Sequence, residues 1–132
     1  MARDRPPRVL VVDDDQAIRD LLREALEDEG YAVWTTAGPP ATADVAALRP
    51  DLVLLNHRLR TEETGWDAAR RLRAEPATAP IPLLLLTAAV ADLRPLAPEL
   101  AARGIGLLLK PFDLDELLAA VARAAAPAAG AP

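Results

Sequence analysis

Polar side chains end four separate apolar segments of this chain, and their chemistry suits a phosphoryl group. Asp13 and Asp14 follow the first segment, and Thr87 and Lys110 end two later ones. Adjacent carboxylates suit a hard cation such as Mg²⁺. A hydroxyl and an ammonium group can contact phosphoryl oxygens. This set could support phosphoryl transfer by positioning and charge neutralisation. The remaining segment, LVLLNHRL, presents the neutral amide of Asn56 instead.

Each of these residues also has an ordinary structural explanation. Asp15, next to the acidic pair, could simply cap a helix. Thr87 alone could cap a strand end, and Lys110 alone could be solvated. The functional interpretation therefore depends on whether the fold brings the four segment ends together.

Apolar runs and helix-period segments alternate along the chain, which predicts a parallel sheet covered by helices. The strands are expected at residues 8–12, 31–36, 52–56, 81–87 and 107–109. Five such units predict a three-layer α/β sandwich with a five-stranded parallel sheet and right-handed crossovers. Ligands of such sheets bind beyond the carboxyl ends of the strands. The candidate residues should therefore meet at one edge.

The helices are expected at residues 15–30, 40–48, 66–74 and from 112 onward. A fourth helix, between 91 and 104, should be short and begin no earlier than Pro95, because prolines cannot sit in a helix interior. Asp113 and Glu116 predict a capping box for the last helix. The buried stripe of the first helix is expected at Ile18, Leu21, Leu22, Ala25 and Leu26.

Composition limits the classes of function. A length of 132 residues predicts one domain, with a core at about 8–125 and a flexible tail at 126–132. The net charge of −5 argues against direct binding to nucleic acid. Without cysteines, an N-terminal apolar signal or a long apolar run, we expect a cytoplasmic protein with no disulfide and no membrane span.

Four motifs resemble those of bacterial response-regulator receiver domains, in the order and near the spacing of that family. They are VLVVDDDQAIRDLL, PDLVLLNHRL, LLLLTAA and LLLKPFDLDELL, and the resemblance extends from about Arg8 to Ala125. The resemblance implies a CheY-like fold with strand order 2-1-3-4-5. It also implies a signalling role within two-component phosphorelays rather than an enzyme.

The resemblance assigns roles to individual residues. Asp13 and Asp14 would be the Mg²⁺-binding acids, with the backbone carbonyl of Arg58 as a further ligand. Thr87 would be the switch hydroxyl. Lys110 would contact the phosphate and would be followed by a cis peptide bond to Pro111.

Departures from the family pattern fall on the same motifs. Asn56 stands where the family has its phosphoacceptor aspartate, and an amide is neutral and uses its nitrogen to donate hydrogen bonds. Arg60 replaces a usual proline, in a loop that is one residue longer before Gly65. Leu107 replaces the aromatic switch residue. We therefore expect no acyl phosphate of the usual kind and weak Mg²⁺ binding. We also expect that Thr87 and Leu107 do not relay phosphorylation to the surface.

These observations predict an atypical receiver that acts as a phosphorylation-independent protein-interaction module. Its partner would be a histidine kinase or another signalling protein. It could form a homodimer through the face of the fourth helix, fifth strand and fifth helix. Two alternatives stay open: a phosphorylatable receiver using a deamidated Asn56 or a neighbouring group, and a small-molecule-binding α/β domain. His57 should point away from the acidic pair, and Trp34 and Trp66 should serve packing.

Overall fold

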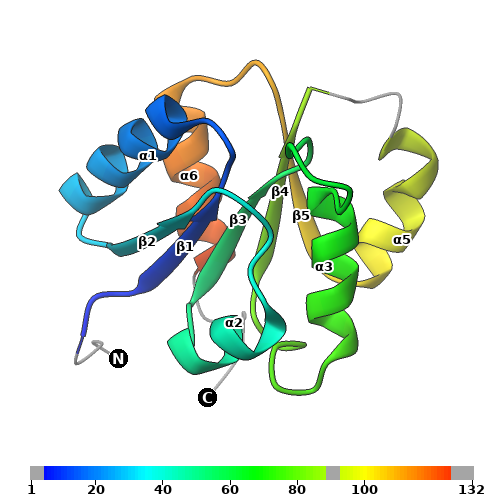
Figure 1. The fold of residues 1–132 in the computed structure, drawn as a ribbon. Coiled ribbons are helices and arrows are strands. Elements are labelled where there is room, and N and C mark those ends of the chain that lie inside the picture. Colours follow the sequence, from blue (N-terminus) through cyan, green and yellow to red (C-terminus); the bar gives the residue numbers. More distant parts are fainter. Residues whose placement is uncertain (1–4, 89–92, 126–132) are drawn as a thin grey trace.

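A twisted sheet of five parallel strands forms the centre of the computed structural model, which describes residues 5–88 and 93–125. The strand order is β2-β1-β3-β4-β5, as predicted (Figure 1). The strands are β1 (Arg8–Val12), β2 (Ala32–Thr36), β3 (Leu52–Asn56), β4 (Leu83–Thr87) and β5 (Ile105–Leu109). Every residue of β3 and β4 is buried, as expected for central strands covered on both faces.

Helices cover both faces of this sheet (Figure 1). Helices α1 (Gln16–Asp28) and α6 (Leu114–Ala125) lie on one face. Helices α2 (Thr42–Leu48), α3 (Gly65–Ala74) and α5 (Ala97–Ala102) lie on the other. The three-layer α/β prediction is therefore confirmed. Several predicted starts shift by one or two residues; for example, β2 begins at Ala32, β4 at Leu83 and α2 at Thr42.

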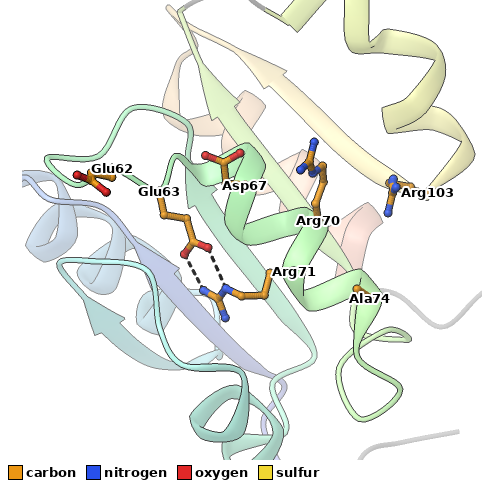
Figure 2. Close-up of a pocket in the computed structure, with 7 residues that line it drawn as sticks. All are labelled: Glu62, Glu63, Asp67, Arg70, Arg71, Ala74 and Arg103. Atoms are coloured by element: carbon orange, nitrogen blue, oxygen red, sulfur yellow. Dashed lines mark hydrogen bonds and ion pairs between the residues drawn. The ribbon is translucent and has the colours of Figure 1, made fainter.

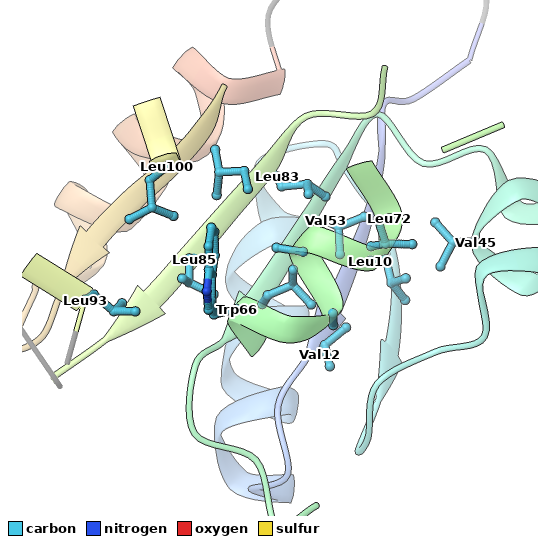
Figure 3. Packing of buried hydrophobic residues seen from close by; sticks show 14 residues of the cluster. Leu10, Val12, Val45, Val53, Trp66, Leu72, Leu83, Leu85, Leu93 and Leu100 are labelled. Atoms are coloured by element: carbon cyan, nitrogen blue, oxygen red, sulfur yellow. The ribbon is translucent and has the colours of Figure 1, made fainter. Parts of the chain in front are cut away.

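The two faces of the sheet carry separate apolar clusters. On the α2–α3–α5 face, Trp66 and Leu72 pack against alternate strand residues such as Leu85 (Figure 3). On the other face, Leu26 of α1 and Leu117 of α6 pack against the remaining alternate set. Burying each such side chain contributes about 1.5–3 kcal/mol. This packing fixes the strand ends that carry the polar residues.

The predicted stripe of α1 was too wide. Leu22, Ala25 and Leu26 are buried, whereas Ile18 is 38% and Leu21 54% exposed. Apolar periodicity reports which residues share a helix face, but the width of the face that the sheet covers depends on tertiary packing. Ile18 and Leu21 lie at the margin of that face.

Strand β5 is longer than predicted, because it includes Ile105 and Gly106. A glycine weakens the sequence signal of a strand. Here Gly106 lies close to a neighbour: a Cβ built on it would be 3.1 Å from Cδ1 of Leu84. Close packing against β4 therefore explains a glycine that looks out of place in the sequence.

The segment before β5 is short and contains two prolines. Arg94–Leu96 form a 3-10 turn, and helix α5 begins at Ala97. Leu93, before Pro95, is already helical, so the predicted start at or after Pro95 is not confirmed. Residues 91 and 92 of the predicted region lie outside the described residues, as does the predicted tail at 126–132. Among the described residues of this segment, Leu93 and Leu100 are buried in the cluster of this face, and Leu96 packs against it.

The N-terminal caps of α1 and α6 are those that the sequence predicts. The Asp15 side chain accepts hydrogen bonds from the backbone of Ala17 and Ile18, which confirms its capping role. The predicted box of α6 is present: the Glu116 N–H donates to Asp113 Oδ1 at 2.7 Å, and the Asp113 N–H donates to Glu116 Oε1 at 3.3 Å.

Candidate functional site

The carboxyl edge of the sheet gathers the candidate residues. Asp13 follows β1, Asn56 ends β3 and Thr87 ends β4, and these three side chains are only 3%, 8% and 2% exposed. Lys110 follows β5, and its N–H donates to the Thr87 carbonyl at 2.7 Å. The Lys110–Pro111 peptide bond is cis, as predicted. Parallel pairing thus brings together residues that are far apart in the sequence.

Asn56 is held by hydrogen bonds at both ends of its amide. Lys110 Nζ donates to Asn56 Oδ1 at 2.7 Å, and Asn56 Nδ2 donates to the Arg58 carbonyl at 2.7 Å. An ammonium group only donates and a carbonyl only accepts, so the two partners fix which end of the amide is oxygen. The sequence did not predict the second bond, because it depends on how the chain turns after β3.

The acidic pair is also engaged within the chain. Asp13 Oδ1 accepts the N–H of Asp15 at 3.0 Å, and burial raises the pKa of the Asp13 carboxyl above its usual value. Asp14 Oδ2 lies 3.3 Å from Nε of Arg60. Asp13 is therefore the shielded member of the pair, and Asp14 is the member that meets a cation from the loop after β3.

These contacts decide how well the cleft fits a divalent cation. The Arg58 carbonyl already accepts the Asn56 amide, and Asp14 already faces a guanidinium. Within 5–88 and 93–125, no group of three or more His, Cys, Asp or Glu side chains could hold a metal ion. In this arrangement the residues do not form a ready site for Mg²⁺, although two carboxylates are in place.

Gly65 sets the distance between α3 and the end of β3. A Cβ on Gly65 would lie 2.3 Å from the carbonyl oxygen of Asn56, and the Gly65 N–H donates to the His57 carbonyl at 2.8 Å. Only glycine fits this approach. Sequence reasoning missed this contact; the available signal was a glycine at the first position of a helix, where other residues are more common.

The start of α3 is capped by its own side chains. Thr64 Oγ1 accepts the Asp67 N–H at 3.1 Å, and Asp67 Oδ2 accepts the Thr64 N–H at 3.0 Å. The latter bond is the main reason why the pKa of Asp67 lies below its usual value. This capping box fixes the point at which the loop after Asn56 enters the helix.

An open polar pocket borders the same loop (Figure 2). Its walls come from the loop, from α3 and from Arg103 after α5, and its lining includes Glu63, Asp67, Arg70 and Arg71. Arg71 donates to both oxygens of Glu63, at 2.9 and 2.7 Å, and also to Thr42 Oγ1 and the Pro40 carbonyl. Hydrogen bonding to Glu63 raises the pKa of Arg71. Arg71 therefore ties the loop to the start of α2 and to the segment before it.

The remaining candidates lie away from this network. Leu107, on β5, is 39% exposed and pairs in register with the buried Leu85 of β4. Trp66 is buried in the core, as expected for a packing residue. Trp34 is 40% exposed, with the Arg8 guanidinium 5.7 Å from its ring centroid. No described helix is long and apolar enough to cross a membrane.

Known proteins resemble this chain throughout the described fold. It is 38% identical over 116 residues to the DNA-binding dual master transcriptional regulator RpaA of Synechocystis sp., covering 87% of this chain and 47% of that protein. The chain thus spans about half the length of this curated relative. A putative response regulator from Chloroflexus aurantiacus superposes with a TM-score of 0.80 at 29% identity, covering 93% of this chain and all of that one.

A third similar protein is the receiver domain of the sensor histidine kinase PA1611 from Pseudomonas aeruginosa, whose structure has a magnesium ion coordinated in the active site cleft. Its TM-score is 0.71 at 25% identity, covering 91% of this chain and 98% of that one. The family model of the response regulator receiver domain matches residues 9–122. This chain therefore belongs to the response regulator receiver domain family, and it is a signalling domain of the two-component type.

Proposed function

We propose that this receiver domain works without phosphorylation at the usual position, because Asn56 takes the place of the acceptor aspartate. One observation carries the proposal: the Asn56 amide bridges Lys110 Nζ and the Arg58 carbonyl at the carboxyl end of β3. In the family, that end carries the carboxylate that becomes phosphorylated. Here it carries a neutral group that is hydrogen-bonded within the chain at both its oxygen and its nitrogen.

The chemistry of the amide supports the same conclusion. Formation of an acyl phosphate requires an anionic carboxylate oxygen that attacks phosphorus. The Asn56 oxygen is neutral and already accepts a hydrogen bond from Lys110, and its nitrogen is a donor. Neither atom can act as the nucleophile of the usual reaction.

The other residues of the cleft keep the positions from which a receiver could support phosphoryl transfer. We assign Asp13, Asp14 and the Arg58 carbonyl as the metal-binding set, and Thr87 and Lys110 as the groups that would contact phosphoryl oxygens. The magnesium ion in the PA1611 receiver supports the assignment by family likeness. With Asn56 neutral and the Asp14 carboxylate ion-paired, Mg²⁺ binding is weak.

The relay from cleft to surface is also changed. In the family, the switch hydroxyl and an aromatic residue on the last strand move together. Thr87 is buried, but Leu107 has no ring and is 39% exposed on the edge strand β5. A shift of Thr87 therefore has no aromatic ring to displace at this position.

A protein-binding role follows from this pair of changes. Partners, rather than a phosphoryl group, would set the conformation of the domain, each by its differential affinity for two conformations in equilibrium. The partner would be a histidine kinase or another signalling protein of the two-component class. The exposed Leu107 and Leu109 of β5 supply apolar contact area for such a partner or for a second copy of this chain.

The test is intact mass after incubation with acetyl phosphate and Mg²⁺. Wild type should gain no phosphoryl mass, whereas Asn56→Asp should gain one, because Asp13, Asp14, Thr87 and Lys110 remain to neutralise the transferring group. The matched control combines Asn56→Asp with Asp13→Asn and should gain no phosphoryl mass. A phosphoryl adduct on wild type, located by peptide mapping, would overturn the proposal and favour a receiver that uses a deamidated Asn56 or another group.

A further inference from the structure

We propose that Arg60 occupies the place of a divalent cation in the acidic cleft and, with the Asn56 amide, excludes metal from it. The inference rests on the proposed function, because it explains how the cleft of a phosphorylation-independent receiver holds its shape without a bound ion. Arg60 is then a residue that determines metal affinity, although it is not a ligand.

The position of Arg60 supports this role. Its Nε lies 3.3 Å from Asp14 Oδ2, although Arg60 itself comes from the loop after β3. The Arg60 side chain is 86% exposed, and that of Asp14 is 20% exposed. The guanidinium thus approaches the acid from the solvent side, the direction from which a dissolved cation would arrive.

The Asn56 amide blocks a second contact that a cation would need. Its Nδ2–H donates to the Arg58 carbonyl, so that oxygen already faces a donor. The oxygen Asp13 Oδ1 accepts the Asp15 N–H. A cation entering the cleft would therefore compete with donors that belong to the chain at three points: Asp13, Asp14 and the Arg58 carbonyl.

The charges of the cleft lead to the same result. Lys110 acts on Asp13 and Arg60 pairs with Asp14, while Asn56 adds no charge. An aspartate at position 56 with a neutral residue at position 60 would leave two negative charges in excess. Attraction for a divalent ion depends directly on that excess.

The loop that carries Arg60 is anchored on both sides. Before Arg60, the Asn56–Arg58 hydrogen bond fixes the turn out of β3. After it, Glu63 is held by two hydrogen bonds from Arg71 on α3 (Figure 2). Fixing both ends limits the conformations open to Arg60 and lowers the entropy that the pairing with Asp14 costs.

The experiment measures Mn²⁺ binding by electron paramagnetic resonance of the free ion, at low ionic strength. Arg60→Gln is placed in the Asn56→Asp background, where binding is strong enough to measure accurately. We expect its affinity to rise about two- to fivefold over Asn56→Asp alone, the range for loss of one exposed ion pair. The matched control is Arg123→Gln in the same background. It removes an equal charge from the exposed C-terminal part of α6 and should leave the affinity unchanged.

Two further measurements separate charge from damage to the loop. Arg60→Lys keeps a positive charge at position 60, so in the Asn56→Asp background it should leave the Mn²⁺ affinity unchanged. At high ionic strength the Mn²⁺ affinities of Asn56→Asp and of the double variant Asn56→Asp/Arg60→Gln should become more similar, because exposed charges are screened. Equal Mn²⁺ affinity for those two proteins at low ionic strength would overturn the role of Arg60 while leaving the proposed function intact. Equal affinity for wild type and Asn56→Asp would overturn the exclusion by the amide, and phosphorylation of wild type would independently contradict the proposed function.

Discussion

The carboxyl end of β3 and the edge strand β5 differ in how far their side chains are buried and hydrogen-bonded. Asn56 is buried, bonded at both ends of its amide and approached closely by Gly65 of α3. On β5, Leu107 and Leu109 are 39% and 44% exposed beside a helix of six residues. The cleft at the end of β3 is therefore closely packed and hydrogen-bonded, whereas two side chains of β5 are partly in water.

This difference teaches that the two halves of a receiver can change independently. The cleft depends on strand ends that the two apolar clusters fix. The β5 side depends on side chains that pack between β5 and α5, such as Ile105 and Leu100. Low local packing also predicts easier local opening at β5 than at β3.

The largest expected effect on stability is at Leu85 of β4, and its register partner Leu107 of β5 provides the comparison. Leu85→Ala on β4 should lower the free energy of unfolding by about 3–4 kcal/mol, because Leu85 is fully buried in the α3 cluster. Leu107→Ala, at the paired position of β5, should cost less than about 1 kcal/mol, because much of that side chain is in water. Urea unfolding followed by circular dichroism measures both. Similar costs for the two variants would remove the contrast between the regions.

Gly65→Ala should have the next largest effect. Its Cβ would meet the Asn56 carbonyl oxygen at 2.3 Å, so α3 must shift, and we expect a loss of about 2–3 kcal/mol in the free energy of unfolding. Gly38→Ala is the control, since a Cβ there meets only Cγ2 of Thr61 at 4.0 Å. Thermal unfolding of both proteins is the measurement. If Gly65→Ala were as stable as Gly38→Ala, the close contact between α3 and β3 would not hold the cleft.

A smaller effect is expected at the capping box of α3. Asp67→Ala should cost about 1 kcal/mol at neutral pH, because the Thr64 N–H loses its acceptor. The pKa of Asp67 is lower in the folded state than its usual 3.8, so its contribution is complete above that value and disappears as the pH falls through the lowered pKa. The difference between wild type and Asp67→Ala, measured by urea unfolding, should therefore narrow in acid. A difference that stayed constant with pH would show that the charge of Asp67 plays no part.

Much of this fold could be predicted from the sequence because its signals are local. Apolar runs identified the five strands, and their ends located Asp13, Asn56, Thr87 and Lys110 at one edge. The signal failed where tertiary packing decides, as at the exposed Ile18 and Leu21 of α1. It also failed at Gly106, whose place in β5 depends on a neighbouring strand.

The contacts within the candidate site were harder to predict than its location. Nothing in the spacing of residues shows that the Asn56 nitrogen donates to the Arg58 carbonyl or that Arg60 reaches Asp14. Both contacts depend on the path of one loop, which Arg71 fixes through Glu63 from a different element. Residue types can thus indicate what chemistry is available, while the loop path decides which groups are already engaged.

The most direct test compares amide hydrogen exchange in Asn56→Asp before and after treatment with acetyl phosphate. Intact mass first establishes that the variant carries a phosphoryl group. We then expect exchange to change around residues 56–58 and 87–88, at the cleft, and to stay unchanged over β5 and α5, because in the proposed function Leu107 does not transmit the movement of Thr87. A clear change of exchange across Ala97–Leu109 on phosphorylation would contradict the independence of the two regions and show that the relay still operates.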